Sequence, residues 1–277
     1  MKNKRKSRGF LVDFLIGLAL IYLGVMVFLF IIQRSLMYFP EQTRPDRNLF
    51  NAQDMEIISV RTEDGLDLEG WYKAPADPEK PVIVMFHGNA IHIGARAYKA
   101  RLYMNEGYGF LLAGYRGYGG NPGKPFEKGF YKDARAYLSW VTETQGFQQE
   151  DIILYGESLG TGIVIEMASG EFRDVRGLIL ESPYTSFLDL ARRIYFYLPV
   201  RLLLRDRFDN LSKISDVKAP LVFLHGQRDM VVPYEQGRAL YDAANQPKTF
   251  ITINAAGHND LYNSGRISEV LKALEKI

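Results

Sequence analysis

The chain begins with one long apolar run and continues as an alternation of short apolar segments with polar ones. The long run, Phe14–Ile32, reads FLIGLALIYLGVMVFLFII and contains no charged residue. As a helix it would span roughly 28 Å, which is close to the hydrocarbon thickness of a bilayer. This pattern predicts one transmembrane helix that anchors the rest of the chain to a membrane.

After the anchor, short apolar runs of strand character alternate with amphipathic segments of helical period. The expected strands are MEIISVRTEDG, LDLEGWYKAP, PVIVMFHG, YGFLLAGY, DIILYG, VRGLILES, APLVFLHG and KTFITIN. The expected helices are Ile93–Asn105, Phe126–Glu143, TGIVIEMASG, Tyr234–Ala244 and Arg266–Ile277. The first two strands have period two and should pair antiparallel, whereas the later ones are apolar throughout, as buried parallel strands are. The alternation predicts an α/β fold with a mostly parallel central sheet and helices on both faces.

The same pattern divides the chain into three parts. Residues 1–33 form a basic N-terminus and the anchor, residues 34–55 a polar juxtamembrane linker, and residues 56–277 the α/β domain. Within that domain, residues 184–217 interrupt the alternation with a helix-like segment rich in aromatic and basic side chains. Because this insertion follows a strand, we expect it to lie above the strand ends as a cap or lid.

Two other interpretations of the long apolar run are weaker. The core of a cleaved signal peptide is usually about 7–15 residues long and ends in a small-residue site. This run is longer and is followed by QRSLMYFP, which lacks such a site. A buried helix of a soluble domain is seldom apolar over so long a stretch.

Flanking charges predict the orientation of the anchor. Five Lys and Arg residues lie among the first eight positions, against Arg34, Arg44 and Arg47 after the run. The positive-inside rule then predicts a cytoplasmic N-terminus and a domain on the extracytoplasmic side, which is the periplasm if the chain is bacterial. The segment LMYF at 36–39 should hold the domain near the lipid surface.

Composition excludes several classes of function. The formal net charge is +2, so nothing in the charge balance favours nucleic acid as a partner. Cysteine is absent, which excludes disulfides, thiolate catalysis and cysteine metal sites. The four histidines lack the close helical spacing of a zinc site. We therefore expect neither a metal nor an organic cofactor, and the oligomeric state stays open.

The glycine-rich stretch LYGESLGTG offers three chemical interpretations. A dinucleotide fingerprint would need a third glycine at Ile165, and a phosphate-binding P-loop would need Gly-Lys where Thr161 and Gly162 stand. The nucleophile-elbow pattern G-x-S-x-G fits residues 156–160 in full, between an expected strand and an expected helix. Side chains at both flanking glycines would clash across so sharp a turn. The stretch therefore indicates Ser158 as a nucleophile.

A serine hydroxyl needs an adjacent general base, and in this setting the chain order is serine, acid, histidine. Of the histidines after Ser158, His225 lies inside the strand LVFLHG, whereas His258 lies in the loop AAGHND after a later strand. We expect His258 to be the base. Asp229, just after the strand LVFLHG, is the expected acid, and Glu181 at the end of GLILE is the alternative.

The oxyanion of an acyl-transfer reaction needs preorganised N–H donors. The backbone N–H of Leu159, directly after the nucleophile, is one expected donor. The second should come from the loop HGNA after the strand PVIVMFHG, from Asn89 or else from Ala90.

Four further polar residues have other interpretations. His87 should brace the HGNA loop, and Asp260, beside the expected base, should cap a helix. Arg116 lies in the Gly- and Pro-rich loop GYRGYGGNPGKP and either binds an anionic substrate group or braces neighbouring loops. The pattern assigns no task to His92.

With these motifs placed, the chain resembles the α/β-hydrolases, and among them the membrane-anchored, bud-emergence-protein-like branch. The resemblance extends from about Leu36 to Ile277 and is carried by HGNA, YRGYGGNPGKP, YGESLGTG, ESPYTSF, LLLRDRFDN, LHGQRDMVVPYEQGRALY and AGHNDL. It implies the α/β-hydrolase fold and serine hydrolase chemistry. Some eukaryotic members of this branch remove palmitoyl groups from proteins, so the resemblance does not fix the substrate.

The sequence therefore predicts a membrane-anchored serine hydrolase that cleaves carboxylic esters or thioesters through an acyl-enzyme. The apolar segment Tyr195–Leu204 and the anchor favour an acyl or lipid-like substrate. An amidase or peptidase would use the same three residues and stays open as an alternative. A non-catalytic membrane scaffold is less favoured, because serine, acid and base are all present.

Overall fold

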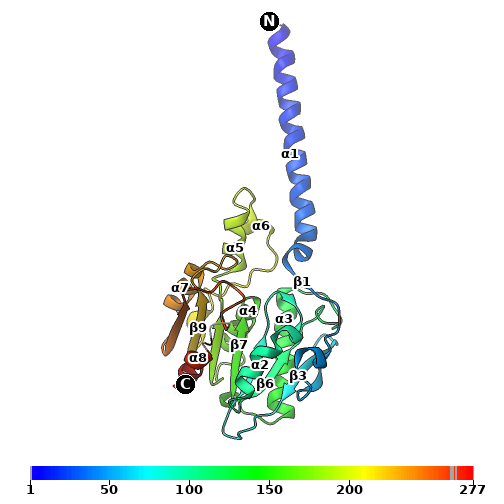
Figure 1. Cartoon of the computed structure of the whole chain (residues 1–277). Helices are drawn as coiled ribbons and strands as arrows, with labels where there is room; N and C mark the ends of the chain where they lie inside the picture. The colour runs from blue at the N-terminus through cyan, green and yellow to red at the C-terminus, as the bar shows by residue number, and fades with distance from the viewer. Residues whose placement is uncertain (1, 263–264, 266, 277) are drawn as a thin grey trace.

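A computed structural model describes residues 2–262, 265 and 267–276, and eight strands of this described chain form one sheet (Figure 1). The order across the sheet is β10-β9-β8-β7-β4-β6-β3-β2. The strands are β2 (Glu56–Arg61), β3 (Asp67–Lys73), β4 (Val82–Phe86), β6 (Gly109–Ala113), β7 (Ile152–Glu157), β8 (Gly177–Glu181), β9 (Leu221–Gly226) and β10 (Lys248–Ile253). Neighbours from β6 to β10 pair parallel, whereas β3 pairs antiparallel with both β2 and β6. The predicted mostly parallel sheet is confirmed.

Helices cover both faces of the sheet because its central strands send alternate side chains to opposite sides. In β4, Val82, Val84 and Phe86 join one buried cluster, and Ile83 and Met85 join the other. The first cluster takes side chains from α3, α4 and α7, and the second from α2 and α8. These helices are α2 (Ala97–Met104), α3 (Glu127–Ser139), α4 (Leu159–Ser169), α7 (Tyr234–Ala243) and α8 (Ile267–Leu274).

Several expected helices have different bounds in the structure. The helix expected at 126–143 ends at Ser139 and continues as a π-helical turn, η3 (Trp140–Thr144). Arg266 and Ile277, the ends of the last expected helix, lie outside the described residues. Short 3₁₀ turns complete the helical elements: η1 (Arg47–Phe50), η2 (Ile93–Arg96), η4 (Gln149–Asp151) and η5 (Ile214–Asp216).

The insertion at 184–217 lies above the carboxyl ends of the strands and is only partly helical. It contains α5 (Phe187–Ile194), α6 (Val200–Leu203) and the turn η5, joined by irregular chain. We call residues 184–217 the cap. In Figure 1 the cap rises from the same side of the domain as the N-terminal helix.

The N-terminal helix α1 (Lys2–Met37) projects away from the domain (Figure 1). Its segment Gly9–Met37 is long and apolar enough to cross a membrane, and a signal sequence at this end of a chain passes the same test. After α1, the short strand β1 (Phe39–Pro40) pairs with β5 (Ala90–Ile91) of the domain. The stretch expected as a linker, 34–55, is thus packed against the domain, with Tyr38, Ala52 and Met55 buried.

Candidate active site

Ser158 occupies a strained turn between β7 and α4. Its backbone has φ 49° and ψ −110°, a conformation that L-residues rarely adopt. A Cβ on Gly156 would lie 2.6 Å from the Cα of Thr161, and a Cβ on Gly160 would lie 1.9 Å from the carbonyl oxygen of Phe86. Glycine is therefore required on both sides of the serine, for the steric reason that the sequence indicated.

Ser158, Asp229 and His258 come together from the ends of three different strands. Ser158 follows β7, Asp229 follows β9, and His258 follows β10. The Nε2 atom of His258 lies 3.0 Å from Ser158 Oγ, and its Nδ1 atom lies 2.7 Å from Asp229 Oδ2. This is the geometry in which a carboxylate orients an imidazole and the imidazole accepts a proton from a hydroxyl.

The environment of Asp229 favours its ionised form. Its Oδ1 atom accepts hydrogen bonds of 2.8 Å from the backbone N–H groups of Val231 and Val232. Burial raises the pKa of this carboxyl, but the hydrogen bonds from His225 and His258 outweigh burial and leave the pKa below its usual range. His225, whose Nε2 lies 3.4 Å from Asp229 Oδ2, is thus a neighbour of the acid that sequence reasoning missed. Its position four residues before Asp229 was the available signal.

The two residues expected to supply oxyanion donors, Leu159 and Asn89, both border the cavity that Ser158 lines. Leu159 is the first residue of α4, so its N–H has no acceptor within the helix. The Asn89 loop is held by its side-chain amide, which donates to the carbonyl of Met37, and by Tyr118, whose hydroxyl donates to the Asn89 carbonyl at 3.1 Å.

A buried ionic cluster lies behind the nucleophile turn. Glu157, the residue before Ser158, accepts hydrogen bonds from Arg96 at 2.7 Å and from Lys99 at 2.9 Å. The Lys99 ammonium also donates to both carboxylate oxygens of Glu181 at 2.8 Å. Burial raises the pKa of Glu157, but the charges of Lys99 and Arg96 dominate and hold it well below the usual range.

Glu181, the alternative acid, belongs to this cluster. Its carboxylate bonds Lys99 and the hydroxyl of Tyr155, and the bond to His258 Nδ1 is made by Asp229 instead. Of the two carboxylates considered from sequence, the structure therefore brings Asp229 to the histidine.

A large apolar cavity opens above Ser158. Its volume is about 530 Å³. Its floor carries Ser158, His258 and the Asn89 loop, and its walls come from the cap, from α1 and from Val231 and Val232. The wall side chains of the cap are mainly apolar: Tyr184, Phe187, Leu190, Ala191, Ile194, Tyr195, Leu198, Val200, Leu203 and Leu204.

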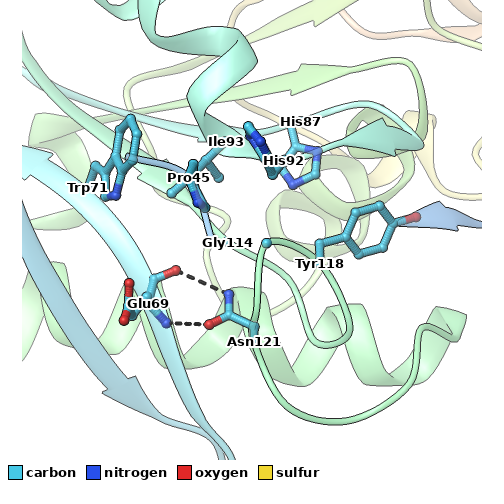
Figure 2. Close-up of a pocket in the computed structure, with 10 residues that line it drawn as sticks. Pro45, Glu69, Trp71, His87, His92, Ile93, Gly114, Tyr118 and Asn121 are labelled. Carbon is cyan, nitrogen blue, oxygen red and sulfur yellow. Dashed lines mark hydrogen bonds between the residues drawn. The ribbon is translucent and has the colours of Figure 1, made fainter. Parts of the chain in front are cut away.

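A second, much smaller cavity of about 10 Å³ is bordered by two histidines and is not lined by Ser158 (Figure 2). The His87 Nδ1–H donates to the Gly88 carbonyl at 2.8 Å, and its ring stacks on Tyr115 with 4.1 Å between centroids. Burial, and next the charge of Arg96, lower the pKa of His87 to about 3. His87 therefore stays neutral and braces its loop. His92 is also buried, with Nε2 3.6 Å from a Glu41 carboxylate oxygen.

Two other residues singled out from sequence have structural contacts. Arg116 is buried and forms ion pairs with Asp64 at 2.9 Å and Asp133 at 2.8 Å, so it braces loops. Asp260 accepts a hydrogen bond of 2.7 Å from the Gly257 N–H and stabilises the turn around His258. The expectation that Asp260 caps a helix is wrong, because the next described helix, α8, begins only at Ile267. Among the described residues, no group of three or more His, Cys, Asp or Glu could hold a metal ion.

Comparison with known proteins places these features in a wider context. Residues 77–205 match the model of the family described as serine aminopeptidase, S33. An uncharacterised protein of Mycobacterium tuberculosis is 35% identical over 244 residues, which cover 87% of this chain and 86% of that protein. Alpha/beta hydrolase domain-containing protein 17B of Homo sapiens is 29% identical over 219 residues, covering 79% and 74% of the two chains. The solved structure of the Pyrococcus furiosus esterase Pf2001 matches with a TM-score of 0.69 at 22% identity, over 87% of this chain and 97% of that one.

Proposed function

This chain belongs to the α/β-hydrolase superfamily, and from that premise we propose that it is a membrane-anchored serine hydrolase of carboxylic esters or thioesters. The observation that carries the proposal is the continuous hydrogen-bonded series Ser158–His258–Asp229 at the floor of an apolar cavity. A series of this kind activates a serine hydroxyl, and the apolar walls favour a substrate with a hydrocarbon chain.

The proposed reaction has two halves. Ser158 Oγ attacks the acyl carbonyl while His258 Nε2 takes its proton, and the Asp229 carboxylate stabilises the imidazolium that forms. The N–H groups of Leu159 and Asn89 stabilise the oxyanion, and His258 returns the proton to the departing alcohol or thiol. Water then attacks the acyl-enzyme with His258 as base, which releases the carboxylic acid and restores Ser158.

Contacts at the end of α1 support retention of the anchor over cleavage as a signal peptide. Arg34 pairs with the buried Asp206 through two hydrogen bonds of 2.8 Å, and Tyr38 donates to the same carboxylate at 3.0 Å. Cleavage after the apolar run at a site beyond Arg34 would leave Asp206, 2% exposed, without this cation. The excess of basic residues before the run supports a cytoplasmic N-terminus and an extracytoplasmic domain.

An amidase or peptidase is a second candidate, because the matching family model is described as a serine aminopeptidase. The discriminating experiment compares p-nitrophenyl butyrate, an acyl thioester and aminoacyl p-nitroanilides on the full chain in mild detergent. Ser158→Ala is the test variant, and Ser169→Ala at the end of α4 is the matched control. Ester or thioester turnover lost only in Ser158→Ala supports the proposal. Faster turnover of the anilides would favour the amidase, and a folded wild type that cleaves none of them would refute hydrolase function.

A further inference from the structure

The last turns of α1 form part of the wall of the cavity above Ser158. Leu29, Gln33, Leu36 and Met37 line it, opposite the apolar side chains of α5 and α6. These α1 residues lie at the end of the segment Gly9–Met37, which is long and apolar enough to cross a membrane. The helix predicted as a simple anchor is thus also a boundary of the candidate active site.

Polar contacts fix this helix against the end of the cap. The Gln33 side chain donates to the Leu203 carbonyl at 3.1 Å and accepts from the Arg205 N–H at 2.9 Å. The buried Asp206, three residues after the end of α6, accepts hydrogen bonds from Arg34 and Tyr38. Because a buried charge without its partner is costly, these contacts give α1 one defined position beside the cap.

The same part of the chain also holds the loop expected to supply an oxyanion donor. The Asn89 side chain bonds the Met37 carbonyl, and the Phe39 N–H donates to the Asn89 carbonyl at 3.4 Å. The pairing of β1 with β5 continues this attachment. The end of α1 is therefore connected both to the wall and to the floor of the cavity.

The tip of the cap is apolar, exposed and close to α1. Ile194, Phe196 and Leu202 are 63%, 83% and 81% exposed. The Tyr22 hydroxyl donates to the Tyr197 carbonyl at 3.3 Å, at a point on α1 eleven residues before Gln33, roughly 16 Å along a helix. An exposed apolar tip that lies this far along a membrane-spanning helix would be immersed in the acyl-chain region of the bilayer.

Basic residues on the cap fit the same placement. Arg192, Arg193, Arg201 and Arg205 lie on or next to α5 and α6, and Arg205 lies over the Phe30 ring at 5.5 Å. Long basic side chains around an apolar tip can reach the phosphate groups while the tip stays in the hydrocarbon. The cavity would then open toward the lipid between α1 and the cap.

We propose that α1 is a structural part of the active site and that the acyl chain of a bilayer-embedded ester or thioester enters the cavity sideways, between α1 and the cap. This inference rests on the proposed hydrolase function. It identifies the substrate class as a long-chain acyl compound held in the membrane, with its carbonyl at Ser158 and its chain along Leu29 and Leu36. The alcohol or thiol departs with a proton from His258, and the carboxylic acid returns to the bilayer after water attacks the acyl-enzyme.

The test compares two tryptophan substitutions on α1 in the full chain, reconstituted in phosphatidylcholine vesicles. Leu29→Trp would place a larger side chain in the cavity, whereas Ile31→Trp changes a side chain that is 68% exposed and does not line the cavity. The measured quantity is the ratio of kcat/KM for p-nitrophenyl palmitate to that for p-nitrophenyl butyrate. Each methylene kept out of the cavity weakens binding roughly fourfold, so exclusion of two lowers the ratio by at least about tenfold.

We expect this drop for Leu29→Trp and an unchanged ratio for Ile31→Trp. Equal ratios in the two variants would overturn the role of α1 while leaving the proposed hydrolase function intact. A wild type that cleaves neither ester would instead refute the proposed function, so the two failures are distinguishable.

A second measurement tests the membrane position of the cap without relying on turnover. Because the chain has no cysteine, Phe196→Cys can be labelled alone with a bimane. The control is Glu79→Cys, just before β4 and near the amino ends of the parallel strands, whereas the cap lies above their carboxyl ends. Lipids brominated in their acyl chains should quench the label at position 196 and leave the label at position 79 unchanged. An unquenched label at position 196 would overturn lateral entry.

Discussion

The buried ionic cluster behind Ser158 gives a quantitative test of how the nucleophile turn is supported. Lys99, 3% exposed, is the cation shared by Glu157 and Glu181. With Arg96, the cluster contains two cations and two carboxylates and is balanced in charge. Lys99→Met removes one cation at similar side-chain length and leaves two buried carboxylates to share Arg96.

The expected loss in the free energy of unfolding of Lys99→Met follows from the burial of the two carboxylates that Lys99 bonds. Breaking a buried ion pair by removing one partner destabilises a protein by about 3–5 kcal/mol, because the remaining charge stays desolvated without compensation. A matched control is Lys132→Met, since Lys132 also pairs with two carboxylates, Glu63 at 3.0 Å and Asp64 at 3.7 Å, but at a partly exposed site. Exposed pairs contribute only about 0–1 kcal/mol.

The assay is urea unfolding of the full chain in mild detergent, compared among wild type, Lys99→Met, Lys132→Met and the double variant Lys99→Met/Glu181→Gln. The double variant restores the balance of charge, so we expect it to regain at least about 2 kcal/mol of the free energy of unfolding. If Lys99→Met costs no more than Lys132→Met, or if the double variant is less stable than the single one, the reasoning from charge balance is refuted.

Two further predictions concern single side chains. Asp229→Asn keeps the shape of the side chain but removes the charge that orients His258, so kcat for ester hydrolysis should decrease by roughly 10⁴-fold. A decrease of less than about tenfold would exclude Asp229 as the acid. His87 has a folded-state pKa of about 3, below its unfolded value, so stability is lost as pH falls from about 6.5 toward that value. In wild type, the free energy of unfolding should fall as the pH is lowered from about 6 to about 4.5, and His87→Gln should reduce this slope by up to about 1.4 kcal/mol per pH unit. The slope is measured by urea unfolding at several pH values, and an unchanged slope in the variant would contradict the burial argument.

The fold and the nucleophile turn were predictable because their signals are local. The turn at Ser158 depends on glycines two positions away on either side, and the buried strands are continuous apolar runs. The selection of Asp229 and His258 needed only the chain order and the strand ends, and the structure brings both side chains to Ser158. Whether they act as acid and base stays a prediction.

The supporting contacts were not predictable because they join distant parts of the chain. Lys99 forms an ion pair with Glu181, which lies 82 positions later in the sequence, and Arg34 forms one with Asp206, which lies 172 positions later. Nothing near either cation in the sequence indicates its partner. Of these two pairs, Arg34–Asp206 joins α1 to the cap, and without this contact the segment after the anchor was expected to be only a linker.

The central claim is that Ser158 is the nucleophile of a serine hydrolase, and reaction with a fluorophosphonate probe tests it most directly. The probe phosphonylates an activated serine, and the modified residue is located by peptide mass spectrometry on the full chain in mild detergent. The account predicts one adduct, on Ser158, that is lost in Ser158→Ala and kept in Ser169→Ala. Labelling that persists in Ser158→Ala, or a folded wild type that does not react, would contradict it.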